Sequence, residues 1–161
     1  RAAGVPLIIN DRVDVMLATD ADGVHVGQED VDARTVRRLI GPHKILGVSV
    51  SGSLEDAKRA LADGADYVGV GAMFKSTTKP GKAAVGPPMA TRVRAEVGDL
   101  PVVAIGGIDA TNAADCILAG ADGVAVVSAL FREKAVAVHA RKMRALIDTA
   151  IKRRDTAGVP P

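Results

Sequence analysis

The chain has 161 residues, of which 48% are hydrophobic, 25% are charged and 2% are aromatic, and its formal net charge at pH 7 is +2. This length and hydrophobic content predict one globular domain with a single core, and the charged fraction argues against intrinsic disorder. A nucleic-acid-binding protein normally has a basic stripe and aromatic stacking residues. The sequence shows neither feature, so we expect no nucleic-acid partner.

The longest apolar runs, such as GVAVVSALF (123–131), are too short to span a bilayer, and RAAGVPLIIN (1–10) lacks the regions of a signal peptide. We therefore expect no membrane association and a cytoplasmic location. Cys116 is the single cysteine, so no disulfide can form within the chain. Its apolar surroundings predict a small buried hydrophobic residue rather than a nucleophile.

Apolar runs alternate with amphipathic segments along the whole chain. Three of the runs predict strands at 6–10, 44–50 and 101–107, and three more strands are predicted within the segments 17–30, 61–74 and 118–131. The segments between them predict helices at 12–18, 32–40, 53–63, 87–97, 110–119 and 132–153. Ser53 with Asp56 forms a plausible N-terminal cap, and Asp109 or Thr111 is expected to start the fifth helix.

Three segments resemble one another: LATDADGVHVGQED (17–30), LADGADYVGVGAMF (61–74) and LAGADGVAVVSALF (118–131). Each passes from a helical pattern through Ala-Asp into a buried strand, which predicts parallel strands joined by right-handed helical crossovers. This pattern is compatible with both an open doubly wound sheet and a (β/α)8 barrel. Glycine and alanine within the strands favour the barrel, because its interior is crowded.

Polar residues and glycines lie at the carboxyl end of every predicted strand. They are Asn10 and Asp11, then Gln28, Glu29 and Asp30, then Ser49 and Ser51, then Ser76 to Lys79, then Gly106 and Gly107, and finally Ser128. Because the carboxyl ends of parallel strands meet at one edge, we expect a single ligand-binding face there.

Two kinds of ligand suit these residues. Asp11 and Asp30 follow adjacent strands, and paired carboxylates are typical Mg²⁺ ligands, although each could instead cap the next helix. Gly106-Gly107 and Ser128 are typical of a phosphate site, because glycine lets an anion approach the backbone.

The loop FKSTTKPG (74–81) offers hydroxyl donors and the Lys79 ammonium to a phosphate, although it could also be a solvated surface loop. His25 lies inside a predicted strand, where a packed imidazole is favoured over a catalytic one.

Several of these motifs together resemble the thiamine-phosphate synthase family. They are PLIINDRVDVMLATDADGVHVGQED (6–30), GVSV (47–50), the F-x-[ST]-x-T-K loop, PVVAIGGI (101–108) and DGVAVVSAL (122–130). The resemblance implies a TIM (β/α)8-type barrel, with about six of the eight βα units present in this chain, over residues 1–153. Residues 154–161 are expected to be a polar tail or linker.

The resemblance also implies the reaction and its site. The enzyme would join 4-amino-5-hydroxymethyl-2-methylpyrimidine diphosphate to a thiazole phosphate, with Mg²⁺ helping the diphosphate to leave. Asp11 and Asp30 resemble the magnesium ligands. Asn10, Ser49 and Lys79 resemble contacts to the pyrimidine diphosphate, and Ser49 and Lys79 are the expected catalytic residues. Ser76, Thr78, Gly107, Val127 and Ser128 resemble contacts to the thiazole phosphate.

Two departures from the family pattern stand out. Lys75 and Ser76 replace the usual proline and threonine, and serine keeps the hydroxyl. The two N-terminal βα units of the family, with a Gln-x-Arg-x-Lys motif, have no counterpart in this sequence. We expect either a preceding segment or a partner chain, including a homo-oligomer, to complete the barrel.

Other functions remain open from the sequence. A thiazole tautomerase-like barrel would not need Asp11, Asp30 and Lys79, and a phosphosugar isomerase or epimerase leaves Asn10-Asp11 and the loop unexplained. An inactive fragment that binds phosphate ligands without turnover is the non-enzymatic alternative.

Overall fold

The computed structural model describes residues 3–75, 83–132 and 134–157. Within these residues six strands form one parallel sheet in sequence order. The strands are β1 (Ile8–Asn10), β2 (Gly23–Val26), β3 (Ile45–Val50), β4 (Tyr67–Val70), β5 (Val102–Ile105) and β6 (Gly123–Ala125). Sequential parallel order with a helix after each strand is the arrangement of a barrel rather than of an open doubly wound sheet, whose strand order reverses.

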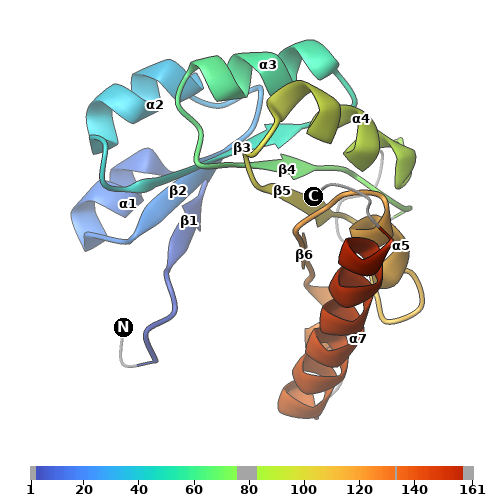
Figure 1. Ribbon diagram of the computed structural model, residues 1–161. Coiled ribbons are helices and arrows are strands. Elements are labelled where there is room, and N and C mark those ends of the chain that lie inside the picture. The colour runs from blue at the N-terminus through green and yellow to red at the C-terminus, as the bar shows by residue number, and fades with distance from the viewer. Residues whose placement is uncertain (1–2, 76–82, 133, 158–161) are drawn as a thin grey trace.

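The helices of the described residues lie along the outside of the curved sheet (Figure 1). They are α1 (Val13–Thr19), α2 (Ala33–Ile40), α3 (Leu54–Ala62), α4 (Pro88–Val97), α5 (Ala113–Leu118), α6 (Ser128–Phe131) and α7 (Val136–Thr156). The sheet curves like an arch from β1 to β6, so the fold is a half-barrel with a concave inner side (Figure 1). No helix of the described ranges combines the length and the apolar composition that crossing a membrane requires.

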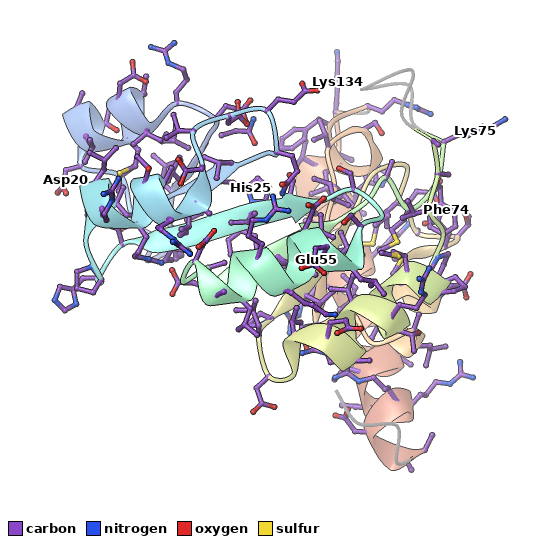
Figure 2. The ribbon with its side chains drawn as sticks, turned by 90° about the horizontal axis from the view of Figure 1, so that it is seen from above. Asp20, His25, Glu55, Phe74, Lys75 and Lys134 are labelled. Carbon is purple, nitrogen blue, oxygen red and sulfur yellow. The ribbon has the colours of Figure 1, made fainter. Side chains whose placement is uncertain are left out.

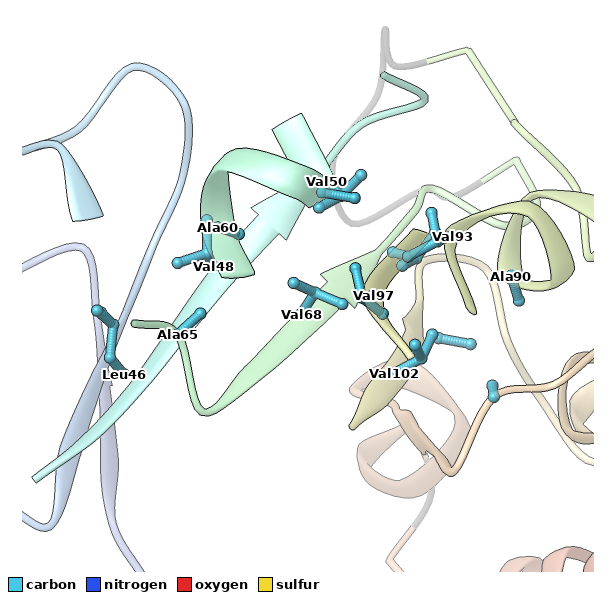
Figure 3. Close-up of a cluster of buried hydrophobic side chains, with 14 of the residues drawn as sticks. Leu46, Val48, Val50, Ala60, Ala65, Val68, Ala90, Val93, Val97 and Val102 are labelled. Atoms are coloured by element: carbon cyan, nitrogen blue, oxygen red, sulfur yellow. The ribbon is translucent and has the colours of Figure 1, made fainter. Parts of the chain in front are cut away.

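The core lies between the sheet and the helices. Alternate strand residues, among them Leu46, Val48 and Val68, are at most 4% exposed, and Val48 lies near Ala60 of α3 while Val68 lies near Val97 of α4 (Figure 3). Side chains alternate across a strand, so the intervening residues face the concave side. Burying each such valine or leucine contributes about 1.5–3 kcal/mol, and this layer holds the strand ends in place.

The Ala-Asp of the three sequence repeats has a structural role. The carboxylates of Asp22, Asp66 and Asp122 each accept a backbone N–H at the start of a neighbouring strand, at 2.7 Å in every case. Asp66 also pairs with Arg37, and Asp122 pairs with Arg94. The repeat therefore ties the amino ends of the strands together, at the edge opposite the predicted site.

Several predicted boundaries differ from the structure, and the largest differences lie in the C-terminal third of the chain. The sixth strand ends at Ala125, and Ser128 is the first residue of α6, because the backbone of Val127 already turns toward a helical conformation (φ −118°, ψ −72°). An apolar run such as GVAVVSAL cannot distinguish a strand end from a short helix. The fifth helix starts at Ala113, after a turn in which Asp109 accepts a hydrogen bond from Thr111 N at 2.8 Å.

The last helix starts later and continues further than the predicted 132–153. Helix α7 ends at Thr156, within the segment expected to be a tail, and Arg154 is only 5% exposed. Its guanidinium donates to the Ala121 carbonyl at 3.0 Å. Arginine in a polar C-terminal sequence suggests solvent exposure, and only packing reveals this contact.

Candidate active site

One row of residues crosses three neighbouring strands. The parallel register pairs His25 of β2 with Gly47 of β3, and Gly47 with Tyr67 of β4. A side chain at Gly47 would overlap both the Tyr67 ring and His25 Nδ1. Glycine at this position therefore lets the two outer residues of the row meet above it.

His25 bonds to two hydroxyl groups through its two ring nitrogens. Nδ1 lies 2.9 Å from the Tyr67 hydroxyl, and Nε2 lies 2.9 Å from Ser49 Oγ. The imidazole is half-buried and packs against the tyrosine ring, with the ring centroids 5.4 Å apart. Burial raises the pKa of Tyr67, so this phenol keeps its proton at neutral pH. The structure confirms the prediction of a packed imidazole.

Ser49 occupies the next inward position of β3, two residues beyond Gly47. Its backbone carbonyl accepts a hydrogen bond from Gln28 Nε2 at 2.7 Å. The loop after β2 and the side chain of His25 therefore both hold Ser49. The predicted contact residue is restrained at its backbone and at its hydroxyl.

A pocket of about 160 Å³ lies at the carboxyl ends of β3, β4, β5 and β6. It brings together four residues predicted to contact substrate: Ser49, Gly107, Val127 and Ser128. The wall also contains Gly106, which the sequence predicts as part of a phosphate site, and Ser51, which it names only as a strand-end serine. Sequence reasoning missed the remaining residues of the wall: Gly69, Gly71, Ala72, Ile105, Ile108, Ala125 and Val126. For Gly69, Ile105 and Ala125, which lie on strands, the available sequence signal was the period of two that puts alternate residues on the inner side.

The glycines after β5 lie against the loop that follows β4. Met73 N donates to the Ile105 carbonyl at 2.9 Å, and Phe74 N donates to the Gly106 carbonyl at 3.0 Å. On the far side of the loop, Val85 N donates to the Ala72 carbonyl at 2.8 Å. These bonds hold both ends of the loop beside the pocket.

Lys75 extends outward from the point where this loop begins (Figure 2). Ser76, Thr78 and Lys79, which the sequence predicts as ligand contacts, lie outside the described residues. Their roles stay predictions.

The predicted magnesium ligands follow β1 and β2. Asp11 has a positive φ of 63°, and its backbone N–H donates to the His25 carbonyl at 2.8 Å, so it continues the pairing of these strands. Asp30 Oδ2 accepts a hydrogen bond from Gly27 N at 2.7 Å, which folds its carboxylate back over the end of β2. Asn10 is exposed and precedes Asp11 directly.

This pair of carboxylates fits the chemistry of Mg²⁺. Magnesium takes one or two protein carboxylates and completes its shell with water and phosphate oxygens. Among the described residues no group of three or more His, Cys, Asp or Glu side chains is placed to hold a metal. The described residues therefore do not form a site in which protein side chains alone coordinate a metal. Magnesium binding at Asp11 and Asp30 stays a prediction.

Cys116 is fully buried, as the sequence predicts. Burial raises the pKa of its thiol to about 11, with a smaller contribution from the charge of Asp115. The thiol is therefore protonated at neutral pH and lacks the thiolate that nucleophilic catalysis requires.

Residues 1–130 match the protein-family model described as thiamine monophosphate synthase. The chain is 56% identical over 148 residues to the thiamine-phosphate synthase of Chloroflexus aurantiacus, covering 91% of this chain and 67% of that protein. It is 52% identical to the thiamine-phosphate synthase of Roseiflexus sp. (strain RS-1), covering 98% of this chain and 66% of that protein. The chain thus spans about two thirds of the length of these curated relatives.

Among solved structures, that of the thiamine phosphate pyrophosphorylase from Pyrococcus furiosus is similar to this chain. It superposes with a TM-score of 0.84 at 36% sequence identity, over 94% of this chain and 71% of that chain. The family model, the relatives and the half-barrel agree with the motifs found in the sequence. The chain belongs to the thiamine monophosphate synthase family.

Proposed function

We propose that this chain carries the greater part of a thiamine-phosphate synthase, a transferase. It would join 4-amino-5-hydroxymethyl-2-methylpyrimidine diphosphate to a thiazole phosphate and release pyrophosphate. The observation that carries the proposal is the pocket at the strand ends, whose wall contains Ser49, Gly107, Val127 and Ser128. Membership of the family supports the same reaction.

The diphosphate half of the site is assigned to residues at and just beyond the carboxyl ends of β1, β2 and β3, and to the loop after β4. Asn10 and Ser49 would donate hydrogen bonds to phosphate oxygens, and Lys79 would add a positive charge. Asp11 and Asp30 would hold Mg²⁺, which when bound offsets the negative charge of the departing diphosphate. Charge stabilisation of the leaving group is the main contribution that such residues make to the rate.

The thiazole phosphate is assigned to the pocket between β4, β5 and β6. The backbone at Gly107 and the Ser128 hydroxyl would bind the phosphate, and Ser76 and Thr78 would add hydroxyl donors. Ile105 and Val127 provide the apolar wall against which a thiazole ring can pack. Their exposed fractions are 41% and 59%, so their side chains are accessible to a ligand.

The proposed complete fold is a TIM (β/α)8 barrel, of which the six βα units described above are a part. A reducing cytoplasm suits the buried reduced thiol of Cys116. The small-molecule substrates and Mg²⁺ are the proposed ligands.

The test is formation of thiamine phosphate by the chain in the presence of both substrates and Mg²⁺. Asp11→Ala is expected to abolish product formation while leaving the fold largely intact. Asp14→Ala is the matched control, because Asp14 is an exposed carboxylate that pairs with Arg12 two residues away. Product from the wild type but not from Asp11→Ala supports the function. Equal product formation by the wild type and Asp11→Ala contradicts it, and absence of product from the folded wild-type chain would mean that the site is incomplete without a further segment or a partner chain.

A further inference from the structure

The hydrogen bonds of His25 connect a half-buried phenol to a hydroxyl on the pocket wall. Tyr67, His25 and Ser49 come from three neighbouring strands, and each of the two contacts measures 2.9 Å. Ser49 is the member of the three that lines the pocket. The chain of bonds therefore runs from the interior of the half-barrel to the proposed ligand.

The chemistry of the ligand limits which atoms can donate. A phosphate or diphosphate oxygen accepts hydrogen bonds, so the Ser49 hydroxyl must donate its single proton toward the anion. Ser49 Oγ must then accept from His25, which requires a proton on Nε2. A neutral imidazole with its proton on Nε2 has an acceptor at Nδ1, and the Tyr67 hydroxyl must donate to it.

We propose that His25 is a positioning residue that makes Ser49 a hydrogen-bond donor to a diphosphate, with Tyr67 fixing the imidazole tautomer. This inference rests on the proposed function, because it takes the group in front of Ser49 to be an anion. The proton order is Tyr67 O–H to Nδ1, then Nε2–H to Ser49 Oγ, then Ser49 O–H to the ligand. The protonated phenol is consistent with this order, because burial disfavours the phenolate.

The glycines around His25 support a dedicated arrangement. A Cβ at Gly69 would lie 3.0 Å from His25 Cε1, and one at Gly47 would overlap the imidazole. Alanine at either position would push the ring away from Ser49 or Tyr67. The two glycines therefore leave the space that the imidazole occupies between Tyr67 and Ser49.

The first test is the imidazole tautomer. ¹⁵N chemical shifts of the histidine-labelled chain, assigned with His25→Asn, report which nitrogen carries the proton. We expect an Nε2–H tautomer in the wild type and a mixture in Tyr67→Phe, which lacks the donor to Nδ1. A wild-type Nδ1–H tautomer or a doubly protonated ring at neutral pH would overturn the inference, whatever the activity of the chain.

The second test is a double-mutant cycle on the binding of inorganic pyrophosphate with Mg²⁺, measured by calorimetry. Ser49→Ala and His25→Asn are each expected to weaken binding about tenfold, as the loss of a hydrogen bond to an anion does. The double variant should bind no more weakly than Ser49→Ala alone, because His25 acts through Ser49. Independent losses, about a hundredfold together, would overturn the inference, as would a wild type that does not bind pyrophosphate.

Tyr67→Phe is the conservative variant in case His25→Asn fails to fold. It removes one hydroxyl and should weaken pyrophosphate binding, but only when Ser49 is present. Thr91→Val is its matched control, because Thr91 Oγ1 donates to the Ala119 carbonyl on the outer surface, away from the pocket. A chain that passes both tests but forms equal amounts of thiamine phosphate with and without the Asp11 carboxylate would contradict the proposed function and leave this inference standing.

Discussion

The α-carbon of Gly107 lies against the carbonyl group of Phe74: a side chain at position 107 would come within 2.7 Å of the Phe74 oxygen. Gly107 also has a φ of 66°, in the region that favours glycine. The contact joins the loop after β5 to the start of the loop after β4. Both predicted phosphate-binding segments therefore depend on the absence of a side chain at this position.

Gly107→Ala is expected to lower activity roughly 100-fold, the loss that follows removal of one well-placed anion-binding donor. The alanine would have to push the Phe74–Lys75 backbone away or tilt its own peptide groups away from the ligand. Activity assays and urea unfolding measure the two effects separately. Gly98→Ala is the control, because Gly98 also has a positive φ (59°), but an alanine methyl there would meet no atom within 4 Å. Equal loss of activity in both variants would show that backbone strain alone is responsible.

Asp30→Asn is expected to raise the Mg²⁺ concentration needed for half-maximal activity by about tenfold or more, since a carboxylate is a far better magnesium ligand than an amide. The asparagine oxygen can still accept the hydrogen bond from Gly27 N, so the loop should keep its shape. Magnesium titration of initial rates measures the change. Asp14→Asn is the control and should leave the magnesium titration unchanged. An unchanged titration for Asp30→Asn would show that Asp30 is not a magnesium ligand.

Arg94→Ala is expected to destabilise the fold by about 3 kcal/mol, in the range for breaking a largely buried ion pair. The Arg94 side chain is 12% exposed, pairs with Asp122 and donates to the Gly98 and Leu100 carbonyls. Its loss would leave a carboxylate and two carbonyls without this partner at the amino ends of the strands. Urea unfolding measures the change, with the exposed Arg92→Ala as a control expected to shift stability by no more than about 0.5 kcal/mol.

The stability of the chain should fall at alkaline pH in part because of Cys116. Burial raises the pKa of this thiol to about 11 in the folded chain, whereas a cysteine in the unfolded chain has a pKa of about 8.5. The unfolded state therefore releases the proton first. The contribution of Cys116 is fully present below about pH 8.5 and declines as the pH rises through the folded value.

The comparison that isolates this effect is Cys116→Ala against the wild type. The difference in their free energies of unfolding should be constant up to about pH 8.5 and should shrink toward pH 11, because alanine has no proton to lose. Urea unfolding at a series of pH values measures it. A difference that does not change with pH would mean that the thiol is not desolvated in the folded chain.

The sequence alone determined the parallel α/β order and the family. Six β-branched runs alternating with amphipathic segments have only a few compatible topologies, and sequential right-handed crossovers place every strand end on one side. For that reason the strand-end residues Ser49, Gly107 and Ser128 were expected on one face, and they line the same pocket, together with Val127, which the family resemblance supplied. Local motifs were sufficient because each lies within a few residues of a strand end.

Tertiary structure decided what depends on register and packing. The meeting of His25 with Tyr67 and Ser49 requires three strands aligned to the residue and a glycine between them, and no local pattern specifies that alignment. The same holds for Arg154, a polar residue near the end of the chain that packing buries against Ala121. Sequence periodicity predicts on which face of its own strand or helix a residue lies. Contacts between residues of different strands and helices depend on how the whole sheet curves.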